Sequence, residues 1–263
     1  MTVFHRSIPA DVWDAATTRE LPGVSPVSQS DLLRIDEIYA QQMKVRDYLI
    51  SECPNSVLQT SPEALSAVQE ALEFVLVQVR SKAEFHVSHK QVARPDGEIV
   101  AIDWDAPLLT IGRLIQEDFC LLQKTAEEHV LTGAALCFPA GWTLSEKIGR
   151  PLLRIHRPVA SYDDVLGRRV QRMFDGLKID RPIWRANALI AKEAELFAPR
   201  PEASADRGFS VHGAYLRSER QTLFRLPNCK AIAFAIHTYL IPISELSEDR
   251  QLKLQQMGKL EQS

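Results

Sequence analysis

Residues 215–243 read "YLRSERQTLFRLPNCKAIAFAIHTYLIPI", two β-rich stretches separated by a short turn. Pro227 and Asn228 form the centre of this turn, because both residue types favour a tight reversal of the chain. The stretches on either side are rich in apolar and β-branched residues and are predicted to pair as antiparallel strands. This hairpin is central to the fold class, because the other predicted elements must pack around it.

The residues before the hairpin add strands and a helix in the order of an α+β core. A strand is predicted at 129–139, a helix at 162–177 and a further strand at 183–192. A sheet that helices cover on one side can leave a cavity between the two layers. We therefore expect an α+β fold in which a ligand binds between sheet and helices.

The N-terminal half is predicted to be mainly helical. Residues 1–30 contain three prolines and a glycine, which interrupt regular structure, and are expected to form an extended arm. The triplet Pro-Asp-Gly predicts a β-hairpin near 92–102. Apolar residues recur at helical spacing in three segments, 31–53, 61–82 and 113–124.

Length and composition favour one compact globular unit. The chain has 263 residues, of which 45% are hydrophobic and 25% charged. The patterns above divide it into an arm at 1–30, a helical region packed on the core at 31–125, the core at 126–245 and a C-terminal helix at 246–263.

Composition and missing motifs argue against several function classes. A net charge of −3 without a run of Lys or Arg argues against nucleic-acid binding. The four cysteines form no CxxC pair, which argues against a structural zinc site or a disulfide framework and suits a reducing compartment. No apolar run has the length of a signal peptide core or a membrane span, so a cytoplasmic protein without membrane contact is expected. The sequence also lacks the G-x-S-x-G, P-loop and G-x-G-x-x-G motifs.

The last predicted strand has a face of small residues. Strand alternation places three alanines on the same side as His237 and Tyr239. Such a face leaves room for a large flat ligand or for a helix packed very close.

Arg220 in the preceding strand lies among apolar neighbours. It needs a partner, because burial of an unpaired guanidinium is too costly. A structural carboxylate, from Glu219 or Glu193, and the carboxylate of a ligand fit equally well.

The segment 137–159, "CFPAGWTLSEKIGRPLLRIHRPV", contains a histidine whose surroundings are rigid. Pro158 restricts the backbone after His156, and a rigid segment can hold an imidazole in one direction, as a metal ligand requires. The alternative is a hydrogen-bonded core histidine. Nearby basic residues could neutralise carboxylates or only solvate the loop; they are Lys147, Arg150, Arg154 and Arg157.

Five motifs resemble one known family. In chain order they are "QEDFCLL", "LCFPAGWTLSEKIGRPLLRIHRPV", "RANALI", "RSERQTLFRLP" and "IHTYLIP". Together they are similar to the α-subunit family of haem-dependent oxidative N-demethylases, many members of which are catalogued only as a domain of unknown function. The resemblance covers roughly residues 20–245.

The resemblance implies a PAS-like antiparallel sheet whose helices enclose a cavity for haem b. It implies oxidative demethylation of a small secondary amine such as dimethylamine, with O₂, and release of formaldehyde. Electrons from NADPH would arrive through flavin and iron–sulfur centres of a partner protein, because this chain has no cysteine cluster for such a centre. An oligomer fits this picture. A PAS-type haem sensor and a non-catalytic ligand-binding subunit are the alternatives.

The resemblance also implies roles for individual residues. His156 is the candidate ligand of the haem iron, with His129 and His237 as competitors. Glu219 and Tyr239 are the candidate catalytic residues, Glu219 because an ammonium group favours an acidic partner. Candidates for contact with the haem and its propionates are Lys147, Arg150, Arg154, Arg220, Trp142, Ala233, Ala235 and His237.

Overall fold

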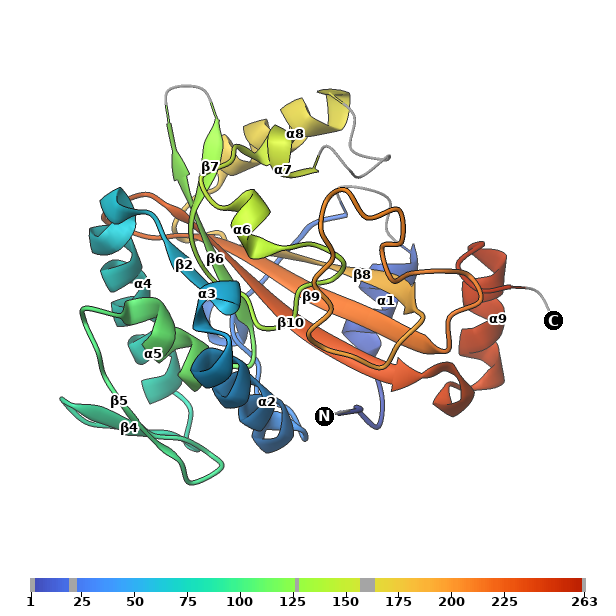
Figure 1. Cartoon of the computed structure of the whole chain (residues 1–263), viewed down its shortest axis with the longest axis horizontal. Coiled ribbons are helices and arrows are strands. Elements are labelled where there is room, and N and C mark those ends of the chain that lie inside the picture. Colours follow the sequence, from blue (N-terminus) through green and yellow to red (C-terminus); the bar gives the residue numbers. More distant parts are fainter. Residues whose placement is uncertain (1–2, 19–22, 126–127, 157–163, 262–263) are drawn as a thin grey trace.

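The computed structural model describes residues 3–18, 23–125, 128–156 and 164–261 (Figure 1). The main sheet has the strand order β1-β8-β9-β10-β6-β7-β2. Every described pair of neighbouring strands is antiparallel, and the strands differ in length. In this order the strands are Ser25–Pro26, Ile183–Ala191, Tyr215–Arg225, Ile232–Pro242, Asp118–Lys124, His129–Ala135 and Leu58–Thr60. The model is therefore an α+β fold, as the sequence predicts.

The hairpin of β9 and β10 forms the centre of the sheet. The two strands pair from Arg225 with Ile232 to Tyr215 with Pro242, which confirms the predicted antiparallel hairpin. Because successive side chains alternate, β10 defines two faces of the sheet. We call the face of Ala233, Ala235, His237 and Tyr239 the A face, and that of Ile232, Phe234, Ile236 and Thr238 the B face.

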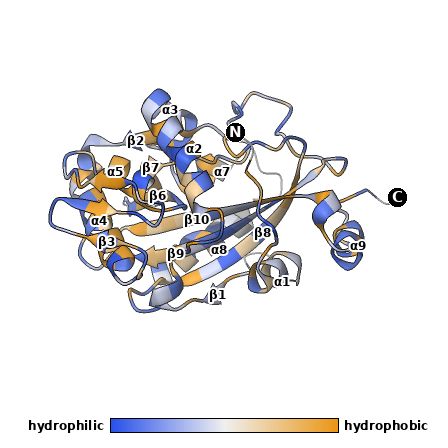
Figure 2. Cartoon of the chain, turned by 90° about the horizontal axis from the view of Figure 1, so that it is seen from below, coloured by the Kyte–Doolittle hydropathy of each residue, from blue (hydrophilic) through white to orange (hydrophobic). Residues whose placement is uncertain are grey.

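Helices from the N-terminal half cover the A face. They are α1 (Ala10–Thr18), α4 (Leu65–Arg80) and α5 (Pro107–Leu114). Helix α2 (Tyr39–Glu52) packs with residues of both faces, with Met43 in the A-face core and Leu49 beside Leu240. Val68, Leu72 and Ile111 are fully buried in one core with Phe224 and Ala233. Figure 2 shows the hydrophobic residues of α4 and α5 gathered where these helices meet the sheet.

Three helices between β7 and β8 cover part of the B face. They are α6 (Leu144–Lys147), α7 (Leu152–His156) and α8 (Asp164–Gly176), and Figure 1 shows them grouped away from α4 and α5. Leu144, Leu152 and Phe174 share a core with Leu223 and Ile232 of the sheet.

Smaller elements complete the described chain. The hairpin predicted near 92–102 is confirmed and belongs to a three-stranded sheet. The remaining bounds are α3 (Pro54–Val57), β3 (His86–Val87), β4 (Gln91–Ala93), β5 (Ile99–Ala101) and α9 (Glu248–Gln256), with 3-10 turns at Gln29–Asp31, Pro62–Ala64 and Ile243–Glu245.

Two expectations for the N-terminal half are wrong. Residues 1–30 are not extended throughout, because α1 follows Pro9, and proline is compatible with a helix start. Val12 and Ala15 of α1 are buried against β8. The helix predicted from residue 31 begins only at Tyr39, after an irregular segment.

The helix predicted at 113–124 is also wrong. Residues 118–124 form β6, which lies inside the sheet and is buried on both faces. Phe119 and Leu121 point to the A face while Cys120 and Leu122 point to the B face, so the strand reads as a continuous apolar run. Periodicity alone does not separate such a strand from a buried helix.

Candidate functional site

Two rows of polar side chains cross the B face of β8 and β9. Arg185 lies opposite Gln221, and Asn187 lies opposite Glu219. Glu219 in turn lies opposite Thr238 of β10. Apolar residues border these rows in the core under α8, so the rows form a polar patch within a partly apolar surface.

Glu219 is the centre of a hydrogen-bonded network. The side-chain amides of Asn187 and Gln221 each donate to its Oε2 atom over 3.0 Å. Nε of Arg217 lies 3.5 Å from Oε1, and both side chains are almost completely buried. Burial lowers the pKa of Arg217 and the charge of Glu219 opposes this shift, so the two charges form a buried ion pair.

Arg185 is the polar residue of the patch with the fewest partners. Its Nη1 donates to Oε1 of Gln221 over 3.3 Å, and its buried Nε has no acceptor among the residues that the structure describes. Burial lowers the pKa of Arg185, and the charge of Glu219 opposes this shift. The hydroxyl of Thr238 is also buried without a partner. Because an unsatisfied buried polar group costs about 1–3 kcal/mol, these atoms indicate a place for the polar groups of a ligand.

The short helices over the B face are anchored by polar contacts. Nζ of Lys147 donates to the carbonyl oxygen of Ile155 over 2.9 Å. Arg154 forms a two-fold ion pair with Glu202, at 2.6 and 3.1 Å. These contacts fix α7, whose last residue is His156. The side chain of His156 and residues 157–163 lie outside the described part of the structure.

The family model described as "Haem-dependent oxidative N-demethylase, alpha subunit-like" matches residues 23–262. The chain belongs to this family. The match covers nearly the whole sequence and confirms the resemblance drawn from the five motifs. Family membership makes haem the first group to test against the patch.

The B face offers part of what a haem of this family would require. A haem pocket needs apolar walls, an axial ligand and cations for two carboxylates. The partly buried Trp142, Phe234 and Ile155 supply apolar surface. Arg185 supplies a cation whose Nε is free of described acceptors. The described residues therefore fit the group in part, through apolar surface and one cation.

The basic residues near α7 that were expected to bind propionates either form contacts within the chain or are exposed to solvent. Lys147 is buried against Ile155, and burial lowers its pKa, while the carboxylate of Glu202 at 3.9 Å opposes this shift. Arg154 is paired with Glu202, and Arg150 is exposed. Lys147 and Arg154 thus position α7 in the described structure.

The remaining candidates lie on the A face, across the sheet from α7. Ala233 and Ala235 pack in the core with Phe224 beneath the helical layer, which is the close-packing alternative. Nη2 of Arg220 donates to the backbone and side chain of Asp31, so its partner is a structural carboxylate different from the two expected. The structure therefore does not bring these residues together with His156.

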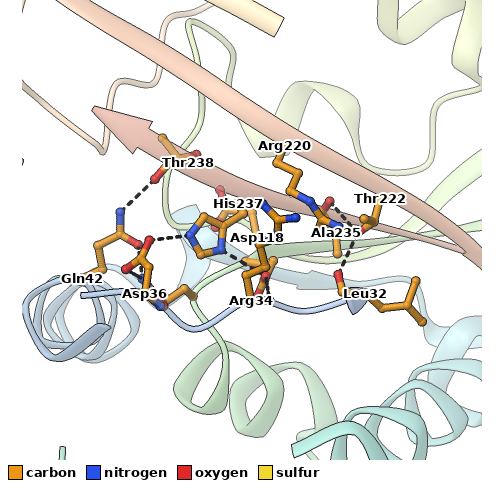
Figure 3. Close-up of polar contacts among 12 residues, drawn as sticks. Leu32, Arg34, Asp36, Gln42, Asp118, Arg220, Thr222, Ala235, His237 and Thr238 are labelled. Carbon is orange, nitrogen blue, oxygen red and sulfur yellow. Dashed lines mark hydrogen bonds and ion pairs between the residues drawn. The ribbon is translucent and has the colours of Figure 1, made fainter. Parts of the chain in front are cut away.

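His237 sits in a buried cluster of charges, shown in part in Figure 3. Its Nε2 lies 2.8 Å from Oδ2 of Asp36, and its Nδ1 lies 3.1 Å from Oε1 of Glu117. Burial opposes the charged form, but Tyr239 and the two carboxylates raise the pKa of His237 well above its usual value. Both nitrogens therefore carry protons, and neither is free for iron. Tyr239, the other catalytic candidate on this face, is buried against the His237 ring.

The same cluster includes a second histidine from the N-terminal segment. Nε2 of His5 lies 2.8 Å from Oδ2 of Asp36, and the backbone N–H of Leu240 donates to His5 Nδ1. His5 Nδ1 is thus an acceptor, and its Nε2 proton points to Asp36. The three ligand atoms of His5, Asp36 and His237 lie within 4.8 Å of one another, but protons occupy the positions that a metal would need.

His129 is held by Gln171 through its backbone N–H and its Nδ1 atom. The backbone N–H of His129 donates to Gln171 Oε1, which fixes the amide so that its Nε2 donates to His129 Nδ1. The proton of the ring then lies on Nε2, which is buried without an acceptor among the described residues. Burial lowers the pKa of His129, so the ring is neutral.

The sequence analysis missed the patch residues Arg185, Asn187 and Gln221. The signal was present in "WRANAL", where Arg185 and Asn187 alternate with residues that pack under α1. A polar face on a strand next to the central hairpin indicates a surface that is not simple core.

The turn before α6 offers a test of how tightly the B face is covered. Gly141 has φ of +70°, and an added Cβ would lie 2.6 Å from the backbone oxygen of Arg207. Gly141→Ala should lower the free energy of unfolding by about 2–3 kcal/mol, because it combines a left-handed backbone with a clash. Gly149→Ala is the matched control, with φ of +71° and no atom within 4 Å. It should cost about 1 kcal/mol in urea unfolding. Equal losses would show that the Arg207 contact is unimportant.

Within the described residues, no helix has both the length and the apolar character required to cross a membrane.

Proposed function

We propose that this family member binds haem b over the B face, beneath α7 and α8, and oxidatively demethylates a small secondary amine such as dimethylamine. The observation that carries the proposal is Arg185, a partly buried cation without a carboxylate among the described residues, on the face where α7 ends at His156. Family membership identifies haem as the group that such a face would hold.

The strand order supports a PAS-like arrangement of the core. The five longest strands of the main sheet, β6 to β10, are arranged in space as second, first, fifth, fourth and third in chain order. This order is compatible with a PAS-like core, and α6 to α8 lie between the second and third of these strands in the chain. A ligand between this sheet and these helices would occupy the position that the resemblance implies.

His156 is the proposed ligand of the iron. It ends α7, which Lys147 and the Arg154–Glu202 pair hold in place. In the sequence a proline follows two residues after His156, and a proline restricts the backbone of the residue before it. Such anchoring would hold an imidazole in one orientation, as axial ligation requires.

The patch residues would bind and orient the substrate. Bound haem supplies the oxygen activation and the one-electron chemistry that side chains lack. The carboxylate of Glu219, held by Asn187 and Gln221, would accept a hydrogen bond from the ammonium group. Trp142 offers an aromatic face to the same cation, and the apolar core under α8 would exclude water. Electrons would come from a separate flavin and iron–sulfur protein.

The absorption spectrum of His156→Ala tests the haem and its ligand together. Wild type expressed with a haem precursor should show a Soret band that the variant loses or shifts, because the axial ligand is removed. His212→Ala is the control, since His212 is 64% exposed and paired with Glu261. An unchanged band in His156→Ala would exclude His156 as the ligand, and a wild type that stays colourless after added haem would exclude the haem itself.

Turnover is measured on the coloured protein. Electron-dependent O₂ consumption and formaldehyde release with dimethylamine are expected. A gas-responsive spectrum without turnover would favour the sensor instead.

A further inference from the structure

Arg185 differs from the fully buried arginines of the described chain. Each of those has a carboxylate oxygen within 4 Å; the pairs are Arg46–Asp118, Arg94–Asp96, Arg217–Glu219 and Arg220–Asp31. No carboxylate of a described residue lies within that distance of Arg185, whose Nε is also without an acceptor. Since burial of a cation without a counter-charge is costly, this position is suited to an anion from outside the chain.

A second cation, Lys259, lies at the outer edge of the same strand. Among the described residues, β1 pairs with β8 at Ile183 and Trp184, the segment 208–210 bonds the backbone of Ile190 and Lys192, and no described strand pairs with the edge between them. There Nζ of Lys259 donates to the carbonyl oxygen of Ala188 over 2.6 Å. The carbonyl that Lys259 contacts belongs to the residue three positions after Arg185 in β8, and burial together with the charge of Arg185 lowers the pKa of Lys259. No described carboxylate forms an ion pair with Lys259.

We infer that Arg185 and Lys259 form a carboxylate-binding site at the outer edge of β8, at the border of the Glu219 patch. Glu219 is already paired with Arg217, and no carboxylate of a described residue lies within ion-pair distance of Arg185 or Lys259. A guanidinium and an ammonium group together suit one or two carboxylates. The inference rests on the proposed function, in which the carboxylate belongs either to a haem propionate or to an amine substrate that is an N-methylated amino acid.

Titration with two porphyrins tests the propionate source. Wild type, Arg185→Gln and Lys259→Gln are titrated with haemin and with haemin dimethyl ester, whose propionates carry no charge. Binding is followed by the Soret band and by quenching of tryptophan fluorescence. We expect wild type to bind haemin about tenfold more tightly than the ester, and each variant to lose most of this preference while binding the ester normally.

Two further variants separate charge from packing. Arg185→Lys keeps the positive charge and should retain most of the preference for haemin. Arg181→Gln removes an exposed cation four residues away and should behave as wild type. Circular dichroism confirms that each variant is folded.

A second titration tests the substrate source. The haemin-loaded protein is titrated with sarcosine, which has a secondary ammonium and a carboxylate, and with dimethylamine, which lacks the carboxylate. If the substrate supplies the carboxylate, the two porphyrins bind wild type alike, and sarcosine shifts the Soret band at about tenfold lower concentration than dimethylamine. Arg185→Gln should abolish this difference.

The outcomes separate this inference from the proposed function. Equal affinity for the two porphyrins, together with equal responses to sarcosine and dimethylamine, would overturn the carboxylate site and leave haem binding intact. If wild type binds neither porphyrin, the proposed function fails. Calorimetric titration of the unloaded wild type and Arg185→Gln with sarcosine then decides the carboxylate site, because only wild type should give heat of binding.

Discussion

Asp118→Ala should lower the free energy of unfolding by about 3–5 kcal/mol. The carboxylate of Asp118 is fully buried and accepts hydrogen bonds from Arg46 Nη1 and the backbone N–H of Cys137 over 2.7 Å, and from that of Phe138 over 2.8 Å. Its removal leaves the buried guanidinium of Arg46 without a counter-charge and two N–H groups without acceptors. Urea unfolding followed by circular dichroism measures the loss.

An exposed ion pair provides the matched control for Asp118. Asp175 pairs with Lys124 at the surface, so Asp175→Ala should change the free energy of unfolding by less than about 1 kcal/mol. Asp118→Asn keeps the volume of the side chain but removes its charge. Its loss in free energy of unfolding should lie between those of Asp118→Ala and Asp175→Ala. A loss of less than 1 kcal/mol for Asp118→Ala would mean that the Arg46–Asp118 pair is not the buried pair described above.

His237→Ala should be the second most destabilising change, costing about 3 kcal/mol or more near pH 6. His237 is the cation between the carboxylates of Asp36 and Glu117, and Glu117 is 1% exposed. Without the imidazolium, two buried or half-buried carboxylates lose their shared counter-charge. The cluster joins the N-terminal segment to β10, so unfolding by urea is also expected to become less cooperative around residues 3–9.

The pH dependence of the stability has a predictable sign. Burial would raise the pKa values of Asp36 and Glu117, but the hydrogen bonds and charge of His237 outweigh it and lower both. Their contribution to stability is present above about pH 4.5 and is lost as pH falls through the folded-state values. The raised pKa of His237 acts in the opposite direction. Its contribution is fully present below about pH 6.5 and is lost as pH rises toward the folded-state value.

Urea unfolding at a series of pH values tests this assignment. The difference in free energy of unfolding between wild type and His237→Ala should be largest between about pH 4.5 and 6.5 and should narrow toward pH 10. His212→Ala replaces an exposed histidine and should leave the profile of wild type unchanged. A difference that stays constant with pH would mean that His237 is neutral in the folded chain.

The strands and helices with one buried face were predictable from the sequence. β9, β10 and their turn follow from alternation and from Pro227-Asn228, and α4 and α8 follow from helical spacing. The failures were β6, which is buried on both faces and has no alternation, and α1, whose helix lies between prolines. In both cases contacts with residues distant in sequence decide the structure.

The candidate site was predictable only in part. Alternation correctly groups the three alanines with His237 and Tyr239, and the family motifs correctly indicate the family. Neither the alternation nor the family motifs say which layer of helices covers the A face. The alanines pack under the N-terminal helices, while α7 lies over the opposite face with Glu219.

The sequence by itself determined the family, through five motifs spread along the chain, and it determined the central hairpin and the residues that share each strand face, because turns and strand alternation depend on local patterns of two to four residues. Only the tertiary structure decided which face carries the polar patch and which charges are already paired. Arg220 forms an ion pair with Asp31, and His237 forms ion pairs with Asp36 and Glu117, all between residues more than a hundred positions apart. Arg185 forms no ion pair with a described carboxylate. The energetic cost of a buried charge depends on whether a counter-charge lies beside it, and only the tertiary structure brings two such residues together.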